Sequence, residues 1–157
     1  MEIKSGFYRI SIKALILNET RNKFLITKEE NGKWELPGGG LDWGKTPQED
    51  LRREIREEMG LSVAKVANHP SYFLTDITDT GMWFANVLFE TELESLDFTP
   101  SDECTEVMFA NLEDIKTLTV YSNVLKFAEM FDPGGYGDMT YGSTSKNRYT
   151  EYPLPRH

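Results

Sequence analysis

The chain has 157 residues, of which 39% are hydrophobic and 12% aromatic, so it suits one globular domain with a real core and excludes a disordered chain. Its 26 acidic and 17 basic residues give a net charge of −9. That balance argues against a general nucleic-acid surface, because the phosphate backbone requires a basic footprint. Small phosphorylated ligands are not excluded, since divalent cations can separate an acidic protein from a polyanion.

Cysteine content and hydropathy exclude several classes of site and indicate where the protein is located. Cys104 is the only cysteine, which excludes an intrachain disulfide and a cysteine-rich zinc site. We expect its thiol to be buried or inert and not catalytic. No apolar run approaches the length of a membrane span, and residues 1–6 lack the features of a signal peptide. We therefore expect a cytoplasmic protein without a membrane partner.

The predicted elements begin with a strand over residues 7–17, which alternate and are rich in β-formers. A polar turn at residues 18–22 leads to a hairpin partner over residues 23–28. A short apolar stretch at residues 34–36 follows. The next residues, 37–40, read Pro-Gly-Gly-Gly, and we expect a loop there in which no regular element persists.

A helix over residues 47–59 is the best-marked element of the chain. Thr46 and Glu49 form a capping box with Pro47 at the first helical position. Gly60 stands where a helix ends on a left-handed residue.

Further strands are predicted over residues 61–67, 71–78, 82–91 and 105–110, and helices over residues 112–115 and 121–131. Strands and helices intermix without regular βαβ alternation, which favours an α/β (α+β) domain, an α/β/α sandwich with a mixed sheet, over residues 1–131. Residues 132–157 form a Gly/Pro/Tyr-rich tail with Tyr136, Tyr141, Tyr149 and Tyr152. Two readings of this tail stay open: a flexible C-terminus, or a strap over the domain or over the partner in a homodimer.

On a helical wheel, the predicted helix has an apolar stripe and an adjoining charged arc. The stripe consists of Leu51, Ile55 and Met59, and the arc consists of Asp50, Arg53, Glu54, Glu57 and Glu58. Burial of the stripe against a sheet leaves the arc facing a common space.

Three glutamates of this arc, Glu54, Glu57 and Glu58, stand at spacings i, i+3 and i+4. They repel one another unless a hard divalent cation joins them as ligands. Alone, such a cluster is typical of a solvated helix face. The glycine stretch and the helix cap, in register with the cluster, favour a metal site instead.

Residues 39–61 resemble the Nudix box: G, five residues, E, seven residues, R-E, an aliphatic, any residue, E-E, any residue, G, an aliphatic. The matching residues are Gly39, Arg53, Glu54, Ile55, Glu57, Glu58, Gly60 and Leu61, and Lys45 stands in place of the first glutamate. The resemblance implies the Nudix α/β/α sandwich.

The resemblance also implies roles for the box residues. Glu54, Glu57 and Glu58, helped by the carbonyl of Gly38, would bind Mg²⁺ or Mn²⁺ against the substrate's diphosphate. Arg53 would hold the carboxylates in place. If the catalytic base comes from the box, it is Glu54 or Glu57.

Three further positions are candidates. Many family members add a carboxylate from outside the box, for which Glu103 and Glu106 are the candidates here, the alternative being a solvated loop. Lys45 reverses the charge of a glutamate that supports the arginine. It can pair with Asp42, Glu49 or a box carboxylate, or reach a substrate phosphate.

Aromatic side chains are candidates for stacking a nucleobase. Trp43, in a loop beside the predicted metal site, is the best of them. For the strand aromatics Tyr72, Phe73, Trp83 and Phe84, core packing is the favoured alternative.

The resemblance implies a pyrophosphohydrolase that acts on acid anhydrides in phosphorus-containing compounds and splits a diphosphate linkage in a small nucleotide. Nucleoside triphosphates, including oxidised ones, come first as substrates; ADP-ribose, dinucleotides and nucleotide sugars follow. The alternative is a non-catalytic nucleotide-binding sensor module, which Lys45 alone supports. The substrate and the base stay open.

Overall fold

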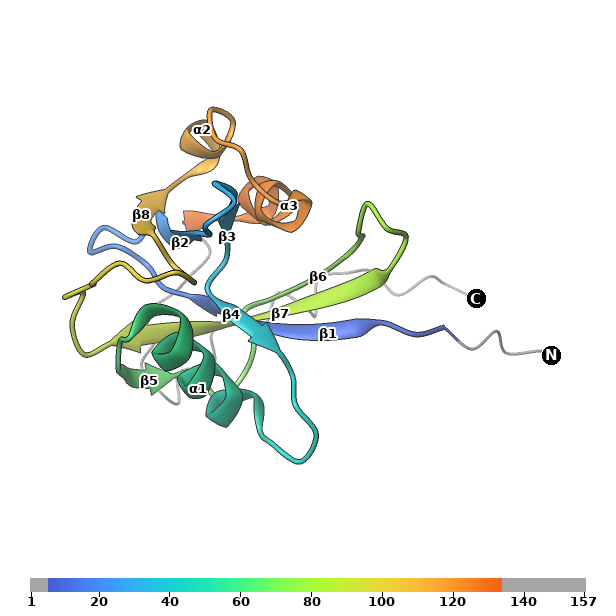
Figure 1. The fold of residues 1–157 in the computed structure, drawn as a ribbon, viewed down its shortest axis with the longest axis horizontal. Helices are drawn as coiled ribbons and strands as arrows, with labels where there is room; N and C mark the ends of the chain where they lie inside the picture. Colours follow the sequence, from blue (N-terminus) through green and yellow to red (C-terminus); the bar gives the residue numbers. More distant parts are fainter. Residues whose placement is uncertain (1–5, 134–157) are drawn as a thin grey trace.

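Two β-sheets form the framework of the computed structural model, which describes residues 6–133 (Figure 1). The larger sheet has the order β4-β1-β7-β5, and β6 also pairs with β7. Its strands are β1 (Arg9–Leu15), β4 (Gly38–Gly40), β5 (Val63–Val66), β6 (Tyr72–Ile77) and β7 (Trp83–Leu93). β1 and β7 run parallel, whereas the other pairs are antiparallel, so the sheet is mixed as predicted.

The smaller sheet has the order β3-β2-β8 and is antiparallel. Its strands are β2 (Phe24–Lys28), β3 (Trp34–Glu35) and β8 (Glu106–Ala110). The helices are α1 (Pro47–Met59), α2 (Leu112–Ile115) and α3 (Ser122–Met130). Figure 1 shows α1 on one side of the strands and α2 and α3 on the other, which is the predicted α/β/α arrangement.

Two buried clusters hold these layers together. Under α1, Leu51 and Ile55 pack with Ile12 of β1 and Phe89 of β7. On the other side, α3 inserts Phe127 among strand residues, and its ring meets the ring of Phe24 edge to face at 4.8 Å between centroids. The larger sheet therefore buries both faces, and β1 contributes side chains to each cluster.

One prediction about the chain before α1 was wrong, and another was confirmed only in part. Residues 37–40 do not form a plain loop, because Gly38–Gly40 is strand β4, paired with β1. Glycine has no side-chain pattern by which such a strand shows itself. Residues 23–28 form β2, and the predicted hairpin is present at its start, where Leu17 pairs antiparallel with Phe24. Beyond this bridge, β2 pairs with β3 and β8 in the smaller sheet. Both strands are apolar, and alternation does not indicate which sheet a strand joins.

The remaining predicted elements are confirmed with small shifts at their ends. No helix within residues 6–133 is long and apolar enough to cross a membrane. The cytoplasmic location stays a prediction. The predicted tail falls, from residue 134 onward, outside the described residues, and both readings of it stay predictions.

Candidate metal and active site

Helix α1 is fixed at both ends by the residues that predicted it. The Thr46 hydroxyl accepts a hydrogen bond from Glu49 N at 3.2 Å, and Thr46 N donates to Glu49 Oε2 at 2.9 Å. The bond from the Thr46 backbone lowers the pKa of Glu49. At the other end, Gly60 has φ 66° and its N donates to Arg56 O at 3.0 Å. The helix bounds, Pro47–Met59, agree with the prediction.

Strand β4 lies between β1 and α1, and its glycines make this possible. Gly38 has φ 127°, and a Cβ there would collide with the backbone of Ile12 and Lys13. A Cβ on Gly39 would fall 2.7 Å from Glu54 Oε1 and 2.6 Å from Glu54 Oε2. The Glu54 carboxylate therefore occupies the space that a side chain on Gly39 would fill.

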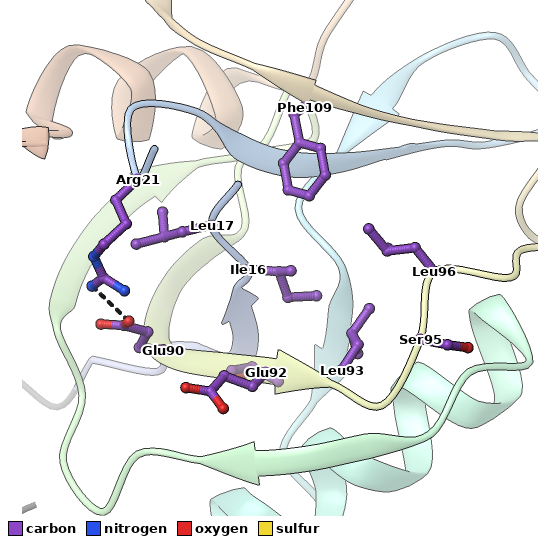
Figure 2. A pocket seen from close by; sticks show the side chains of 10 residues that line it. Ile16, Leu17, Arg21, Glu90, Glu92, Leu93, Ser95, Leu96 and Phe109 are labelled. Atoms are coloured by element: carbon purple, nitrogen blue, oxygen red, sulfur yellow. Dashed lines mark hydrogen bonds and ion pairs between the residues drawn. The ribbon is translucent and has the colours of Figure 1, made fainter. Parts of the chain in front are cut away.

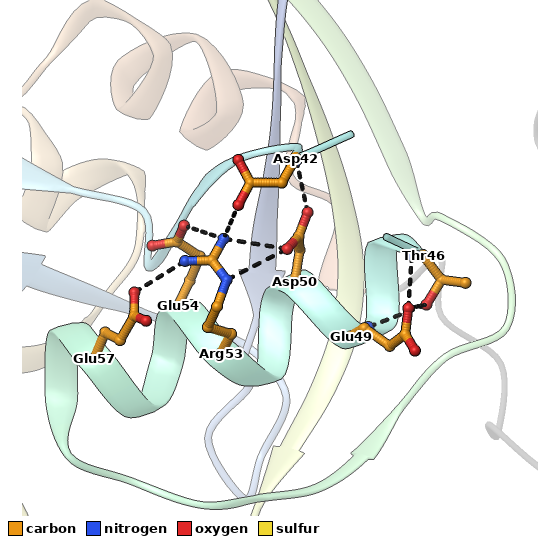
Figure 3. Close-up of polar contacts among 7 residues, drawn as sticks. All are labelled: Asp42, Thr46, Glu49, Asp50, Arg53, Glu54 and Glu57. Carbon is orange, nitrogen blue, oxygen red and sulfur yellow. Dashed lines mark hydrogen bonds and ion pairs between the residues drawn. The ribbon is translucent and has the colours of Figure 1, made fainter. Parts of the chain in front are cut away.

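Arg53 is surrounded by four carboxylates, three from α1 and one from the loop before it (Figure 3). Its Nη2 lies 2.9 Å from Asp42 Oδ2, 3.1 Å from Asp50 Oδ1 and 2.9 Å from Glu54 Oε1. Its Nη1 lies 2.9 Å from Glu57 Oε2. The hydrogen bond to Asp50 is the largest cause that raises the pKa of Arg53. One permanent cation thus holds two of the predicted metal ligands, Glu54 and Glu57, beside each other.

Glu58 points to the other side, into the space between the two sheets. Its Oε1 accepts a hydrogen bond from Thr27 Oγ1 at 2.9 Å, and its Oε2 accepts one from Gly38 N at 3.1 Å. Burial raises the pKa of Glu58 to about 7 although both hydrogen bonds act in the opposite direction. The carboxylate is therefore fixed in orientation, but its charge is incompletely compensated.

The structure thus brings the predicted site residues Gly38, Arg53, Glu54, Glu57 and Glu58 together around β4 and α1. Within residues 6–133, no three His, Cys, Asp or Glu side chains form a group placed to hold a metal ion. Glu54 and Glu57 form ion pairs with Arg53, and Glu58 accepts hydrogen bonds from Thr27 and from Gly38 N. The assignment of metal ligands stays a proposal.

The outlying candidates lie apart from this cluster. Trp43 is fully exposed in the loop between β4 and α1. Lys45, in the same loop, is exposed, and in the described part of the chain it forms no ion pair with Asp42, Glu49 or a box carboxylate. Its charge contributes to the lowered pKa of Glu49.

Glu103 is exposed on the loop before β8, and Glu106 Oε1 lies 2.7 Å from Lys28 Nζ. Tyr72 is buried in the core, whereas Phe73 and Trp83 are about half exposed. Cys104 is buried, as expected.

Two residues of the network were missed or misplaced by the sequence interpretation. Asp50 was expected in the open arc of carboxylates, but its side chain is buried, because it turns beneath the loop and accepts hydrogen bonds from Asp42 N and Arg53. Thr27 was missed because it lies in a strand that carries no motif. It reaches Glu58 only through the tertiary packing of β2 near α1. The signal for Asp50 was its i, i+3 spacing from Arg53.

A pocket of about 380 Å³ lies away from this cluster, at the ends of β1 and β7 (Figure 2). Arg21 Nη2 and Glu90 Oε1 form an ion pair of 2.7 Å at one side of it. The other lining residues are Ile16, Leu17, Thr91, Glu92, Leu93, Ser95, Leu96 and Phe109. None of them belongs to β4 or α1.

Comparison with known proteins agrees with this geometry. The model of the NUDIX domain matches residues 7–130. Among curated proteins, the nucleoside triphosphatase NudI of Enterobacter sp. (strain 638) is 33% identical over 95 residues, which are 55% of this chain and 67% of that protein. The RNA pyrophosphohydrolase of Francisella tularensis subsp. mediasiatica (strain FSC147) is 34% identical over 80 residues, 49% of this chain and 51% of that protein. The matched region thus spans about half to two thirds of these relatives.

Solved structures show the same fold. The MutT protein from Methanosarcina mazei Go1 superposes with a TM-score of 0.62 at 29% identity, covering 83% of this chain and 96% of that one. The E. coli ORF135 protein gives a TM-score of 0.63 at 16% identity and covers 78% of this chain and 86% of that one. Because the NUDIX domain model covers most of the chain and the box residues converge on β4 and α1, this protein belongs to the Nudix family.

Proposed function

We propose that the chain is a metal-dependent pyrophosphohydrolase that splits the diphosphate linkage of a nucleoside diphosphate-linked substrate. The observation that carries the proposal is that Glu54 lies against Gly39 and Glu58 against Gly38 of the glycine strand β4, with Arg53 bridging Glu54 and Glu57. An ordinary solvated helix face explains neither the close fit of Glu54 against Gly39 nor the inward course of Glu58.

The donor chemistry of the three glutamates suits a divalent cation, although in the structure Arg53, Thr27 and Gly38 engage their oxygens. Carboxylate oxygens are the ligands that Mg²⁺ and Mn²⁺ prefer. Glu58 is a partly buried carboxylate with a pKa that desolvation raises to about 7, which is the condition that a nearby cation relieves. Glu54 lies in a space kept open by the missing side chain of Gly39. Glu54, Glu57 and Glu58 would hold the ion, together with the carbonyl of Gly38.

A bound divalent cation supplies charge neutralisation for the diphosphate oxygens and lowers the pKa of a water molecule. The chain's own residues do the rest. Arg53 sets the separation of Glu54 and Glu57, one of which removes the proton from the attacking water. Thr27 and Gly38 keep Glu58 in one orientation. Water adds to one phosphorus, the P–O–P bridge breaks, and two phosphorylated products leave.

We place nucleoside triphosphates, including oxidised ones, first among the substrates. Relatives named as a nucleoside triphosphatase and as an RNA pyrophosphohydrolase support the diphosphate linkage as the common target. The net charge of −9 favours a small substrate over a long nucleic acid. Lys45 and Trp43, both exposed at the loop before α1, are the proposed contacts for a phosphate and a base. Glu103 and Glu106 remain proposed as additional carboxylates.

A substrate panel tests the proposal. It contains nucleoside triphosphates, an oxidised triphosphate, ADP-ribose, a dinucleotide, a nucleotide sugar and an RNA with a 5′ triphosphate, each with Mg²⁺ or Mn²⁺. Products are separated by ion-exchange chromatography. We expect release of a nucleoside monophosphate from at least one small substrate, abolished by Glu57→Gln and by Glu58→Gln. The matched control is Glu92→Gln, which changes an exposed glutamate on β7.

The alternative, a sensor module that binds nucleotides without splitting them, predicts a different result. Tight nucleotide binding without turnover across the whole panel would support it and overturn the enzyme. The three box glutamates proposed to bind the metal, Glu54, Glu57 and Glu58, are all present in this chain, which favours catalysis.

A further inference from the structure

Asp50 is a buried carboxylate that joins two parts of the site. Its side chain is 1% exposed. Its Oδ2 accepts a hydrogen bond from Asp42 N at 2.7 Å, and its Oδ1 accepts from Arg53 Nη2 at 3.1 Å. Arg53 Nη2 in turn donates to Asp42 Oδ2 at 2.9 Å. Asp50, Arg53 and Asp42 therefore form a closed set of contacts between α1 and the loop of residues 41–46 (Figure 3).

Both partners of Asp50 are hydrogen-bond donors, so the side chain at this position must offer two acceptor oxygens. A buried carboxylate is costly unless hydrogen bonds and an opposite charge compensate it. Asp50 has both, and it lies near the N-terminus of α1, where the helix dipole favours a negative charge. An amide of the same size presents its NH₂ group to one of the two donors, so it cannot satisfy both.

The side chain at position 45 does not share in this network. Lys45 stands where the box has a glutamate that supports the arginine, and its side chain is exposed. Arg53 is nevertheless held by carboxylates, with Asp50 as the most buried of its four partners. Arg53 is therefore supported by Asp50 of the helix and Asp42 of the loop, while the side chain at position 45 is not among its partners.

We infer that Asp50 is the positioning residue of this site: it takes over the support of Arg53 from the glutamate that Lys45 replaces, and it ties the loop of residues 41–46 to α1. The inference rests on the proposed function, because the arginine matters through Glu54 and Glu57, which it holds. Asp50 is buried, with Asp42 N and Arg53 as its partners, so it acts on Glu54 and Glu57 through the arginine. It thereby sets the geometry of these proposed metal ligands.

The experiment uses Asp50→Asn and Lys45→Glu, singly and combined, on the substrate that wild type turns over. Loss of a partner behind the ligands lowers activity by about 10- to 100-fold, so we expect a fall of that size in kcat for Asp50→Asn with a smaller change in KM. Lys45→Glu offers Arg53 a new carboxylate. We compare the ratio of kcat with and without Lys45→Glu in the two backgrounds. This ratio should be at least about tenfold higher in Asp50→Asn than in wild type, because the effects of residues that share a partner are not additive.

A second readout does not depend on activity. In a nitrogen-15-labelled protein, the Arg53 Nε–H signal should exchange slowly with water in wild type, because Nε donates to Asp50 Oδ1 at 3.4 Å. It should exchange faster in Asp50→Asn. The control for both readouts is Asp97→Asn, which alters an exposed loop carboxylate. Urea unfolding shows that each variant is folded at the assay temperature.

Three results would overturn the inference: kcat of Asp50→Asn within about twofold of wild type, an unchanged Arg53 signal, or an equal effect of Lys45→Glu in both backgrounds. Failure of the proposed function looks different. In that case wild type itself splits no member of the panel, while the Arg53 signal still reports whether Asp50 holds the guanidinium.

Discussion

At the scale of single residues, the site depends on how one guanidinium is shared. Arg53 lies within 3.1 Å of a carboxylate oxygen from each of Asp42, Asp50, Glu54 and Glu57. A planar group with five N–H donors serves several acceptors at once, and a lysine ammonium is a single point charge. The carboxylates on this side of α1 therefore keep their places through Arg53.

Arg53→Lys should lower kcat/KM by about a hundredfold, which is the cost typical of a misplacement near 1 Å. The charge is kept, but one ammonium cannot hold Glu54 and Glu57 together with the loop carboxylate. Steady-state kinetics on the preferred substrate measure the effect. Arg56→Lys, an exposed position on the same helix, is the matched control. Equal rates for the two variants would refute the role of the guanidinium.

Cys104 should resist alkylation in the native protein. Burial raises the pKa of its thiol to about 11, so the reactive thiolate is scarce at pH 8. Iodoacetamide labelling followed by mass spectrometry should be slow in buffer and fast in urea. Rapid labelling of the native chain would contradict the buried position.

The same thiol should contribute to alkaline destabilisation. In the unfolded chain it ionises near pH 8.5, whereas the folded state holds the proton up to about pH 11. The unfolded state therefore binds fewer protons, and stability falls as pH rises through that window. Cys104→Ala removes this component, so its unfolding free energy should fall less steeply above pH 8.5 than that of wild type. Parallel curves would show that the thiol titrates normally.

At the scale of elements, the site is a helix and a strand held at a fixed distance. The cap at Thr46 starts α1 at the residue that places Glu54 opposite Gly39. The glycines of β4 let that strand pair with β1 while α1 covers it. The position of the carboxylates is thus set by the N-cap residue of α1, Thr46, and by the lack of side chains on the glycines of β4.

Thr46→Ala should destabilise the domain by about 1 kcal/mol, the usual cost of losing an N-cap side chain. Urea unfolding at equilibrium measures it. Thr99→Ala, at an exposed loop position, is the control and should change stability by much less. If both substitutions had equal effects, the cap would not be stabilising α1.

Two neighbouring glycines should respond differently to alanine. Gly39→Ala pushes against the end of the Glu54 side chain, which can move, so we expect activity to fall about a hundredfold while stability changes little. Gly38→Ala meets backbone atoms at a φ of 127°, so it should destabilise the fold itself. Thermal unfolding and kinetics on both variants separate these effects. Full activity in Gly39→Ala would refute the placement of Glu54.

The sequence predicted α1 to the residue because its signals are local: a capping box, a proline at the first helical position and a terminal glycine. It also indicated the apolar stripe, and Leu51, Ile55 and Met59 are buried. It missed β4, since glycines carry no alternation, and the inward turn of Asp50, since the covering loop is not a periodic feature. Thr27 reaches Glu58 through tertiary packing, which no local pattern encodes.

At the scale of the whole molecule, the larger sheet lies between the two buried clusters and contributes residues to both. One face of this sheet packs against α1 and the other against α3, so β1 and β7 place side chains in both clusters. The carboxylates of α1 stand at the margin of one cluster, in a protein of net charge −9. Binding a polyphosphate on this surface requires cations between the two sets of negative charge.

The metal dependence of hydrolysis is the decisive test of catalysis by the carboxylates of α1. Wild type, Glu57→Gln and the control Glu92→Gln are freed of metal with a chelator, and the rate on the preferred nucleotide is measured as Mg²⁺ is restored. Metal-dependent catalysis at this site predicts only the uncatalysed rate without metal, recovery with Mg²⁺ in wild type and in the control, and no recovery in Glu57→Gln. Hydrolysis that persists without divalent metal, or a Glu57→Gln curve that matches wild type, would contradict it.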